Sequence, residues 1–230
     1  MVSFNILSLS TELLLVGQSA NRDKSQDAES KAVDSAEPQA IDGIKENDVY
    51  IQDTNGKLWK TEEWDYSAKP NAIAVITKET KFLIALSQSA MRLSNSDHTP
   101  LENYMFETSF SSVAKGDYNG AGNTANILKA RPNASFAAGY CKGFTFPDKK
   151  TKGYLPSLGQ LYIAYQKKAA VDAALSKCGG TAMTQDYYWT STFWGVGGSY
   201  RHCWVLDWSD GCVDYDSLNL NYDVRPFANF

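Results

Sequence analysis

Oxygen-bearing side chains recur near the C-terminus from Asp214 onward and could bind a cation. Calcium prefers such ligands, and an EF-hand loop needs an oxygen ligand at its fifth position, glycine at its sixth and a carboxylate at its twelfth. Counted from Asp214, these positions hold Leu218, Asn219 and Arg225. A second oxygen-rich segment, DYNG at 117–120, is interpreted as a polar turn. We therefore predict neither a metal nor another cofactor.

Cysteines are the residues that could support redox or nucleophilic chemistry. They are Cys141, Cys178, Cys203 and Cys212. Their spacing fits no CxxC motif for a metal or a redox centre. A reactive thiolate at Cys203 would need an electropositive neighbour such as Arg201 or His202. His202 itself lies in no Ser-His-Asp or paired-carboxylate pattern. We therefore predict no catalytic residue and expect the thiols to be unreactive.

The last 44 residues, 187–230, differ in composition from the rest of the chain and are called the tail below. The tail contains no Lys, Glu, Gln or Met, whereas the first 186 residues contain 38 of these, a rate that would place about nine in the tail. It also carries four of the six Trp. Tyr, Ser, Gly and Asn suit binding surfaces because they give contact area and adaptable hydrogen bonds at low entropic cost. The composition favours a recognition surface, with an ordinary aromatic-rich all-β ending as the alternative.

Two strand pairs are expected in the first half of the chain. The runs 48–53 and 57–59 flank Asn55-Gly56, which predicts a hairpin with a type I′ turn. The runs 72–76 and 81–86 predict the second pair, and both are apolar enough to be buried strands.

A helix and a set of short strands must then position the tail. Apolar residues at near-helical spacing predict a helix over 157–176, with Ser157 as its N-cap, a break near Lys167-Lys168 and a stop at Gly179-Gly180. The tail predicts strands at 187–191, 203–208, 212–215 and 224–227. Asp210-Gly211 predicts the turn between the second and third of these. Strands at both ends around a central helix predict an α+β domain whose terminal strands pair.

Five short motifs carry a family resemblance. They are GYLPSLGQL at 153–161, YWTST at 188–192, CWVLDW at 203–208, DGCV at 210–213 and VRPF at 224–227. The series resembles the closing segments of C-type-lectin-fold proteins that are diversified by retroelements. The resemblance extends over about 49–230. It implies a C-type lectin-like fold, with small antiparallel sheets, one or two helices and long irregular loops.

In that family an error-prone reverse transcriptase randomises adenines, typically in AAC codons. Changes in the first two letters of AAC give residues such as Asn, Asp, Tyr, His, Ser, Cys and Arg, but never Lys, Glu, Gln, Met or Trp. The absence of Lys, Glu, Gln and Met from the tail matches this restriction, whereas the absence of Ile does not follow from it, and Trp is retained at anchor positions.

The resemblance implies variable contact positions and a fixed scaffold. The contact positions are Ser199, Tyr200, His202, Asp207, Ser209, Asp210, Cys212, Asp214, Asp216, Ser217, Leu220, Asn221 and Asp223. The scaffold residues are Trp189, Trp204, Trp208, Gly211, Val213, Val224, Arg225 and Pro226. Within the scaffold, we expect Arg225 to bond a buried carboxylate or backbone carbonyls and Pro226 to end the last strand.

The resemblance implies a non-catalytic protein whose variable surface binds a cell-surface protein or glycan receptor. We expect it at the tip of a phage tail fibre, in the virion tail, with a bacterial cell-surface protein as the alternative. The same fold hosts formylglycine-generating enzymes, which use a C-terminal cysteine pair, so Cys203 and Cys212 keep an enzyme as a second hypothesis. An adhesin of fixed specificity is the third.

Two regions are expected. Residues 1–47 are predicted to be an assembly segment and flexible linker that contacts other tail or surface structural proteins, and residues 48–230 to be the lectin-like domain. The run 18–45 has no aromatic residue and cannot bury a core. The run 5–16 is interrupted by Glu12 and is too short and polar to enter a bilayer. A net charge of −4 and a pI near 5.2 disfavour nucleic acid as a partner. A homotrimer is one expected assembly, because it would add avidity.

Overall fold

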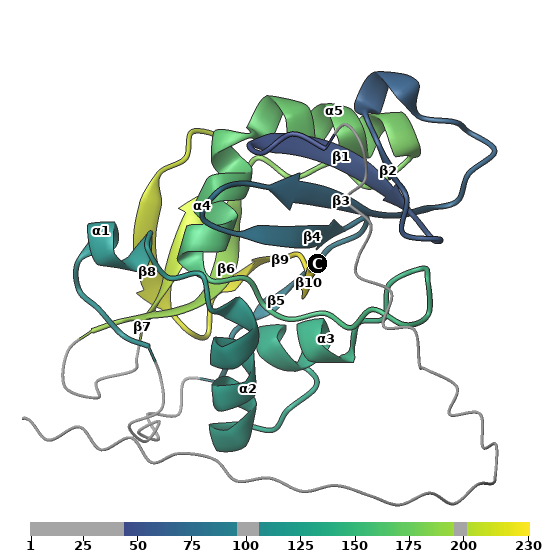
Figure 1. Ribbon diagram of the computed structural model, residues 1–230. Coiled ribbons are helices and arrows are strands. Elements are labelled where there is room, and N and C mark those ends of the chain that lie inside the picture. Colours follow the sequence, from purple (N-terminus) through teal and green to yellow (C-terminus); the bar gives the residue numbers. More distant parts are fainter. Residues whose placement is uncertain (1–43, 96–105, 196–201) are drawn as a thin grey trace, which may run out of the picture. The chain divides into compact units, whose positions relative to one another are not determined.

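Two five-stranded sheets carry the fold in the computed structural model, which describes residues 44–95, 106–195 and 202–230 (Figure 1). Within these ranges, five α-helices and one 3₁₀ helix connect and cover the strands. The described chain is therefore mixed α+β, as the sequence predicted. Most of the predicted segment 1–47 lies outside the described residues.

The first sheet contains β1 (Asp48–Asp53), β2 (Leu58–Trp59), β3 (Pro70–Ile76), β4 (Lys81–Ala85) and β10 (Phe227–Asn229), in the order β10-β4-β3-β1-β2. Both predicted strand pairs are confirmed. The type I′ turn is wrong, because it needs two residues with positive φ and only Gly56 in the β1–β2 loop has one, at +88°. Asp53 organises the loop instead, since its Oδ1 accepts hydrogen bonds from the N–H groups of Asn55 and Lys57.

The second sheet contains β5 (Ser89–Arg92), β6 (Tyr187–Trp194), β7 (His202–Asp207), β8 (Val213–Ser217) and β9 (Asn221–Val224), in the order β5-β9-β6-β7-β8. The first three predicted tail strands are confirmed, although β6 continues three residues beyond its predicted end at Ser191. The sequence did not predict β5, which is short and pairs with β9 from more than a hundred residues away along the chain.

The fourth predicted tail strand, 224–227, is wrong as a single strand. The chain leaves the second sheet after Val224 and enters the first sheet at Phe227, where β10 pairs with β4. Pro226 has no N–H to donate to a ladder, so it lies between two strands rather than at the end of one. The end of the chain thereby joins the sheet formed by the first strands.

The helix predicted over 157–176 is present as α4 (Leu158–Gln166) and α5 (Lys168–Cys178), with the break at Lys167. Ser157 and Gln160 form a capping box at the start of α4, and Gly179, with φ of +75°, ends α5 in the left-handed conformation. The helices that the sequence did not predict are η1 (Thr61–Glu63), α1 (Ser111–Ala114), α2 (Gly120–Ala130) and α3 (Ala137–Gly143). None of the helices in the described ranges is long and apolar enough to cross a membrane.

Both faces of the second sheet are buried at its centre. Trp204 and Leu206 of β7 share one core with apolar side chains of α4, of α5 and of the first sheet. Cys203 and Val205, which alternate with them, lie in a second core with residues of α2 and α3. The tail strands are therefore held from two sides, and their exposed residues lie at the edges and turns of the sheet.

The buried Tyr154 hydroxyl makes the free energy of unfolding depend on pH in the alkaline range. Burial raises the pKa of its hydroxyl from 10.0 to about 12, and this oxygen accepts a hydrogen bond from Gln160 Nε2 at 2.9 Å. Because the pKa is higher in the folded state, the contribution of the neutral tyrosine to stability is complete below about pH 10 and is lost as the pH rises toward about 12.

We expect Tyr154→Phe to lower the free energy of unfolding by about 1 kcal/mol at pH 7 through loss of the hydrogen bond. Between about pH 10 and about pH 12, wild type should lose stability faster than the variant, by about 1.4 kcal/mol per pH unit. Urea unfolding across this pH range measures both effects. Tyr66→Phe is the control, because Tyr66 is exposed. Equal alkaline slopes for wild type and Tyr154→Phe would contradict the assignment.

Candidate recognition surface

Three buried tryptophans anchor the tail to separate parts of the fold. The Trp189 indole N–H donates to the backbone oxygen of Met91 in β5 at 3.0 Å. The Trp204 indole donates to the backbone oxygen of Thr108 at 3.0 Å. The Trp208 indole donates to a carboxylate of α5 at 3.3 Å. Each large side chain is therefore fixed by packing and also by a directed hydrogen bond.

Arg225 is the most connected scaffold residue and is only 1% exposed. Its guanidinium donates to the backbone oxygens of Ala85, Thr181 and Ala182 at 3.0, 2.8 and 3.2 Å. It also donates to Gln88 Oε1 through Nε and Nη2. Burial lowers its pKa to about 10, so it remains charged at neutral pH. Of the two partners predicted for it, backbone carbonyls are confirmed.

Asp117, which the sequence placed in a polar turn, is a buried junction of the framework. Its Oδ2 accepts hydrogen bonds from Thr192 Oγ1 in β6 and Asn123 Nδ2 in α2, both at 2.7 Å. Its backbone oxygen accepts one from Ser157 Oγ at 2.6 Å. The carboxylate therefore joins β6 to α2, and the backbone oxygen of the same residue joins them to the start of α4. Local sequence gave no signal for this role, because two of these partners lie 40 and 75 residues away.

The predicted contact and scaffold residues differ in exposure. Six contact residues are exposed, namely Ser209, Asp210, Cys212, Asp214, Leu220 and Asn221. Five are half-buried, namely His202, Asp207, Asp216, Ser217 and Asp223. Ser199 and Tyr200 lie outside the described residues. The scaffold residues Trp189, Trp204, Trp208, Val224, Arg225 and Pro226 are buried, whereas Gly211 and Val213 are half-buried.

One group of contact residues gathers around Tyr187. Asp207 is its cross-strand partner, and the Asp207 N–H donates to the backbone oxygen of Cys212 at 2.9 Å. Burial raises the pKa of the Tyr187 hydroxyl, and nearby acidic groups raise it further. These groups are Cys212, Asp207, Asp214 and Asp210. The tyrosine therefore lies in a field of negative charge.

Tyr222 extends this group. Its ring centroid is 5.3 Å from that of Tyr187, and its hydroxyl donates to Asp216 Oδ2 at 2.7 Å. Burial and the Asp216 carboxylate both raise the pKa of Tyr222. The resulting surface is called the acidic face below and comprises Tyr187, Tyr222, Asp207, Asp210, Asp214 and Asp216.

An aromatic cluster lies on the other side of the β8 edge. Trp194 and Tyr215 stack with ring centroids 4.0 Å apart and an interplanar angle of 14°. His202 meets Tyr215 edge-on at 5.7 Å. Tyr215 is 40% exposed. Of these three residues only His202 is a predicted contact position, although the alternation of Tyr215 with Asp214 and Asp216 in the sequence was a signal for Tyr215. Trp194, His202 and Tyr215 are called the aromatic cluster below.

Cross-strand pairing explains this division. Tyr215 lies opposite Trp204, whereas Asp214 and Asp216 lie opposite Val205 and Cys203. Successive residues of a strand point to opposite faces, so the acidic face and the aromatic cluster occupy two sides of one edge. Asn221 and Asp223 are the two predicted contact positions on β9, and in the sheet order β6 and β7 lie between this strand and β8.

The backbone of β8 is partly protected by its own carboxylates. The Tyr215 N–H donates to Asp214 Oδ1 at 2.8 Å, and the Ser217 N–H donates to Asp216 Oδ1 at 3.3 Å. Unpaired N–H groups on an edge strand invite pairing with another chain. These bonds therefore favour recognition through side chains over addition of a strand.

Cys203 and Cys212 do not form a pair, and all four cysteines are free. Cys203 is fully buried, and its Sγ lies 3.1 and 3.0 Å from the backbone oxygens of Thr190 and Thr192. Burial raises its pKa far above that of an ordinary thiol. Cys212 is exposed opposite Asp207, four residues along β7 from Cys203, a separation of roughly 13 Å. This geometry offers no support for a reaction that uses both thiols.

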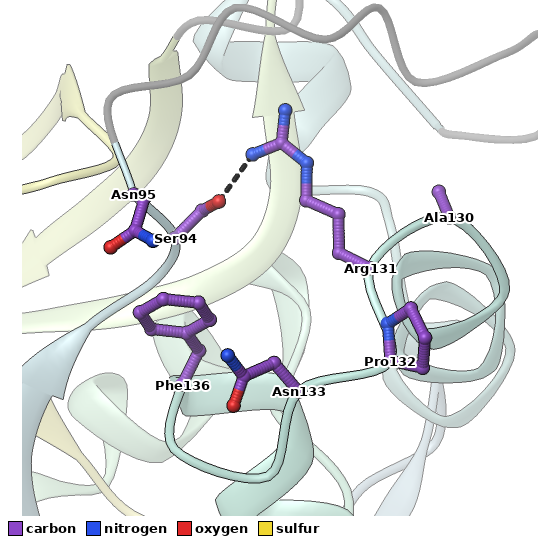
Figure 2. A pocket seen from close by; sticks show the side chains of 7 residues that line it. All are labelled: Ser94, Asn95, Ala130, Arg131, Pro132, Asn133 and Phe136. Atoms are coloured by element: carbon purple, nitrogen blue, oxygen red, sulfur yellow. Dashed lines mark hydrogen bonds between the residues drawn. The ribbon is translucent and has the colours of Figure 1, made fainter.

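A hollow of about 260 Å³ lies between the end of β5 and the connection from α2 to α3 (Figure 2). Its lining residues are Ser94, Asn95, Ala130, Arg131, Pro132, Asn133 and Phe136. Figure 2 shows Arg131 reaching toward Ser94, to whose Oγ it donates a hydrogen bond at 2.5 Å. The hollow shares no residue with the predicted contact positions and is smaller than most ligand pockets.

Metal-ligating side chains do not converge in the described ranges, where no group of three or more His, Cys, Asp or Glu residues could hold an ion. Among known proteins, no family model, no curated protein and no solved structure matches this chain.

Proposed function

We propose that this chain is a non-catalytic receptor-binding protein with a C-type lectin-like fold, whose C-terminal surface recognises a protein or glycan on a cell. The observation that carries the proposal is the separation of the two residue sets. None of the eleven described contact residues is buried, whereas six of the eight scaffold residues are. Diversification by a retroelement accounts for the exposed set through the codon restriction described above.

A stiff framework makes such a surface useful. The bonds of Trp189, Trp204 and Arg225 hold the strands before a target arrives, so little additional ordering entropy is lost on binding. Exposed side chains can then change without altering the core. Residues 1–47 would attach the domain to a phage tail fibre or, alternatively, to a bacterial surface structure. A trimer would strengthen weak individual contacts through avidity.

Comparison of the same locus in several isolates tests this function. Substitutions are expected at the thirteen contact positions, with the tryptophans, Gly211 and Arg225 unchanged. A near-copy of the gene end and a reverse transcriptase gene are expected beside the locus. Changes spread evenly along the chain would contradict diversification and favour an adhesin of fixed specificity.

The difference between exposed contact residues and buried scaffold residues also predicts how the free energy of unfolding responds to substitution. We expect the triple variant Ser209→Tyr, Asp214→Ser and Leu220→Asn to unfold within about 1 kcal/mol of wild type, because exposed substitutions are each nearly neutral. Trp189→Ala should instead lose about 3–5 kcal/mol. Urea unfolding followed by tryptophan fluorescence measures both, with far-UV circular dichroism as the second probe for the variant that lacks a tryptophan. A triple variant as unstable as Trp189→Ala would show that the contact positions belong to the folding core.

A further inference from the structure

Exposed or half-buried aromatic rings lie on both sides of the β8 edge. Tyr215 stacks its ring on Trp194 and remains 40% exposed. On the other side of the edge, the half-buried rings of Tyr187 and Tyr222 lie together. Tyrosine and tryptophan dominate binding energy at protein interfaces, and the electron-rich face of such a ring attracts cations.

The described tail residues near these rings carry charge of one sign. The tail contains five Asp and two Arg, so it supplies −3 of the net charge of −4. Arg225 is buried, and Arg201 lies outside the described residues. Every exposed or half-buried Asp, Glu, Lys or Arg side chain in residues 202–230 is therefore an aspartate.

Three of the aspartates are already oriented. Asp207, Asp210 and Asp214 each accept a backbone N–H through Oδ1, at 2.7, 2.8 and 2.8 Å. Their Oδ2 atoms accept no hydrogen bond from any residue in the described ranges. Each carboxylate therefore presents one oxygen that can meet an incoming donor with little loss of rotamer freedom.

We propose that the aromatic rings and carboxylates of the β8 edge bind a protein surface rich in arginine and lysine. This inference rests on the proposed function and names the class of partner for this particular sequence. Arginine fits best, because one guanidinium can stack on the Tyr187 ring while donating to a carboxylate of the acidic face, and a second can stack on Tyr215 across the edge. A protein is favoured over an amino-sugar glycan because the carboxylates extend from Asp207 to the position opposite Cys203, roughly 13 Å along β7.

Octa-arginine, octaglutamate and a chitosan hexamer are the probes, and isothermal titration calorimetry on the full chain is the measurement. Octa-arginine should bind at low ionic strength and weaken severalfold at about 0.5 M NaCl. Octaglutamate and the chitosan hexamer should bind at least tenfold more weakly, by about 1.4 kcal/mol or more.

Two variants separate charge from rings. The triple variant Asp207→Asn, Asp210→Asn and Asp214→Asn keeps each Oδ1 acceptor and should bind octa-arginine roughly three- to tenfold more weakly. Tyr215→Ala should also weaken binding roughly three- to tenfold. The matched control is Glu62→Gln, Glu63→Gln and Asp65→Asn, which removes three exposed charges near η1 and should leave the affinity unchanged. Thermal melting confirms that each variant is folded. If the triple aspartate variant of the acidic face is not folded, the single variant Asp214→Asn takes its place.

Equal binding of octa-arginine to wild type and the aspartate variant would overturn the proposal. Tighter binding of the chitosan hexamer would overturn it in favour of an amino-sugar glycan. The comparison of loci under the proposed function is independent of these titrations. If substitutions concentrate at the contact positions but octa-arginine does not bind, the function stands and the cationic partner is wrong.

Discussion

Replacing Arg225 by Met is expected to destabilise the fold by about 3–5 kcal/mol, because it leaves several buried acceptors without a donor. The guanidinium serves three backbone carbonyls and the side chain of Gln88. Methionine fills most of the volume of the arginine side chain but donates no hydrogen bond. The loss of stability therefore measures mainly the missing hydrogen bonds and only to a small extent a cavity. The effect should reach both sheets, since Arg225 lies between β9 and β10.

Urea unfolding at pH 7 measures the change. Arg92→Met is the matched control, because Arg92 is an exposed arginine on β5, the strand that pairs with β9. Its replacement should change the free energy of unfolding by less than about 0.5 kcal/mol. Arg225→Lys should fall between the two, since an ammonium group has fewer donors and cannot reach all four acceptors. A loss below about 1 kcal/mol for Arg225→Met would mean that water or a relaxed backbone satisfies the carbonyls.

The parts of the fold that the sequence predicted are those fixed by local chemistry. Asn55-Gly56 marked a hairpin, Ser157 marked a helix start, and Gly179-Gly180 marked a helix end. Each signal is contained within a few residues and needs no knowledge of the tertiary structure. The turn type failed at the first of these because the Asp53 side chain competes for the loop N–H groups.

The parts that the sequence did not predict depend on distant contacts. β5 is a strand because β9 pairs with it, and Asp117 is a junction because Thr192 and Ser157 fold against it. The division of 224–227 between two sheets depends on where Arg225 finds its acceptors. Hydrophobic patterns and residue propensities describe only local sequence, so they do not predict contacts between residues that are far apart along the chain.

The candidate surface was predictable in composition but not in arrangement. The predicted contact positions are exposed or half-buried wherever the structure describes them. Their division between two sides of β8 follows from cross-strand register, and a slip of one residue would exchange the sides. Tyr215 was missed because tyrosine is common both in cores and in binding surfaces, so its type alone does not separate the two.

Gly211→Ala is expected to destabilise the fold by about 2–5 kcal/mol for two reasons. Gly211 has a φ of +79°, a conformation that costs other residues about 1–2 kcal/mol. A Cβ at this position would lie 2.2 Å from Cε1 of Tyr165, far inside contact distance. Relief of such a clash moves side chains or backbone and costs about 1–3 kcal/mol more. Tyr165 also packs edge-on against Trp208, so the strain should spread into the anchored core.

Gly56→Ala separates the two contributions. Gly56 has a φ of +88°, but no atom lies within 4 Å of the position that a Cβ would take there, so only the conformational part should remain. The double variant Gly211→Ala with Tyr165→Leu should recover about 1 kcal/mol or more relative to the sum of the single variants, because the ring edge that meets the new methyl is gone. Equal losses for Gly211→Ala and Gly56→Ala would exclude the steric contribution. The exposed residues Asp210 and Asp214 lie on either side of Gly211 in the sequence. Substitution of Gly211 would therefore alter the framework, whereas substitution of its exposed neighbours would change the surface with little effect on the fold.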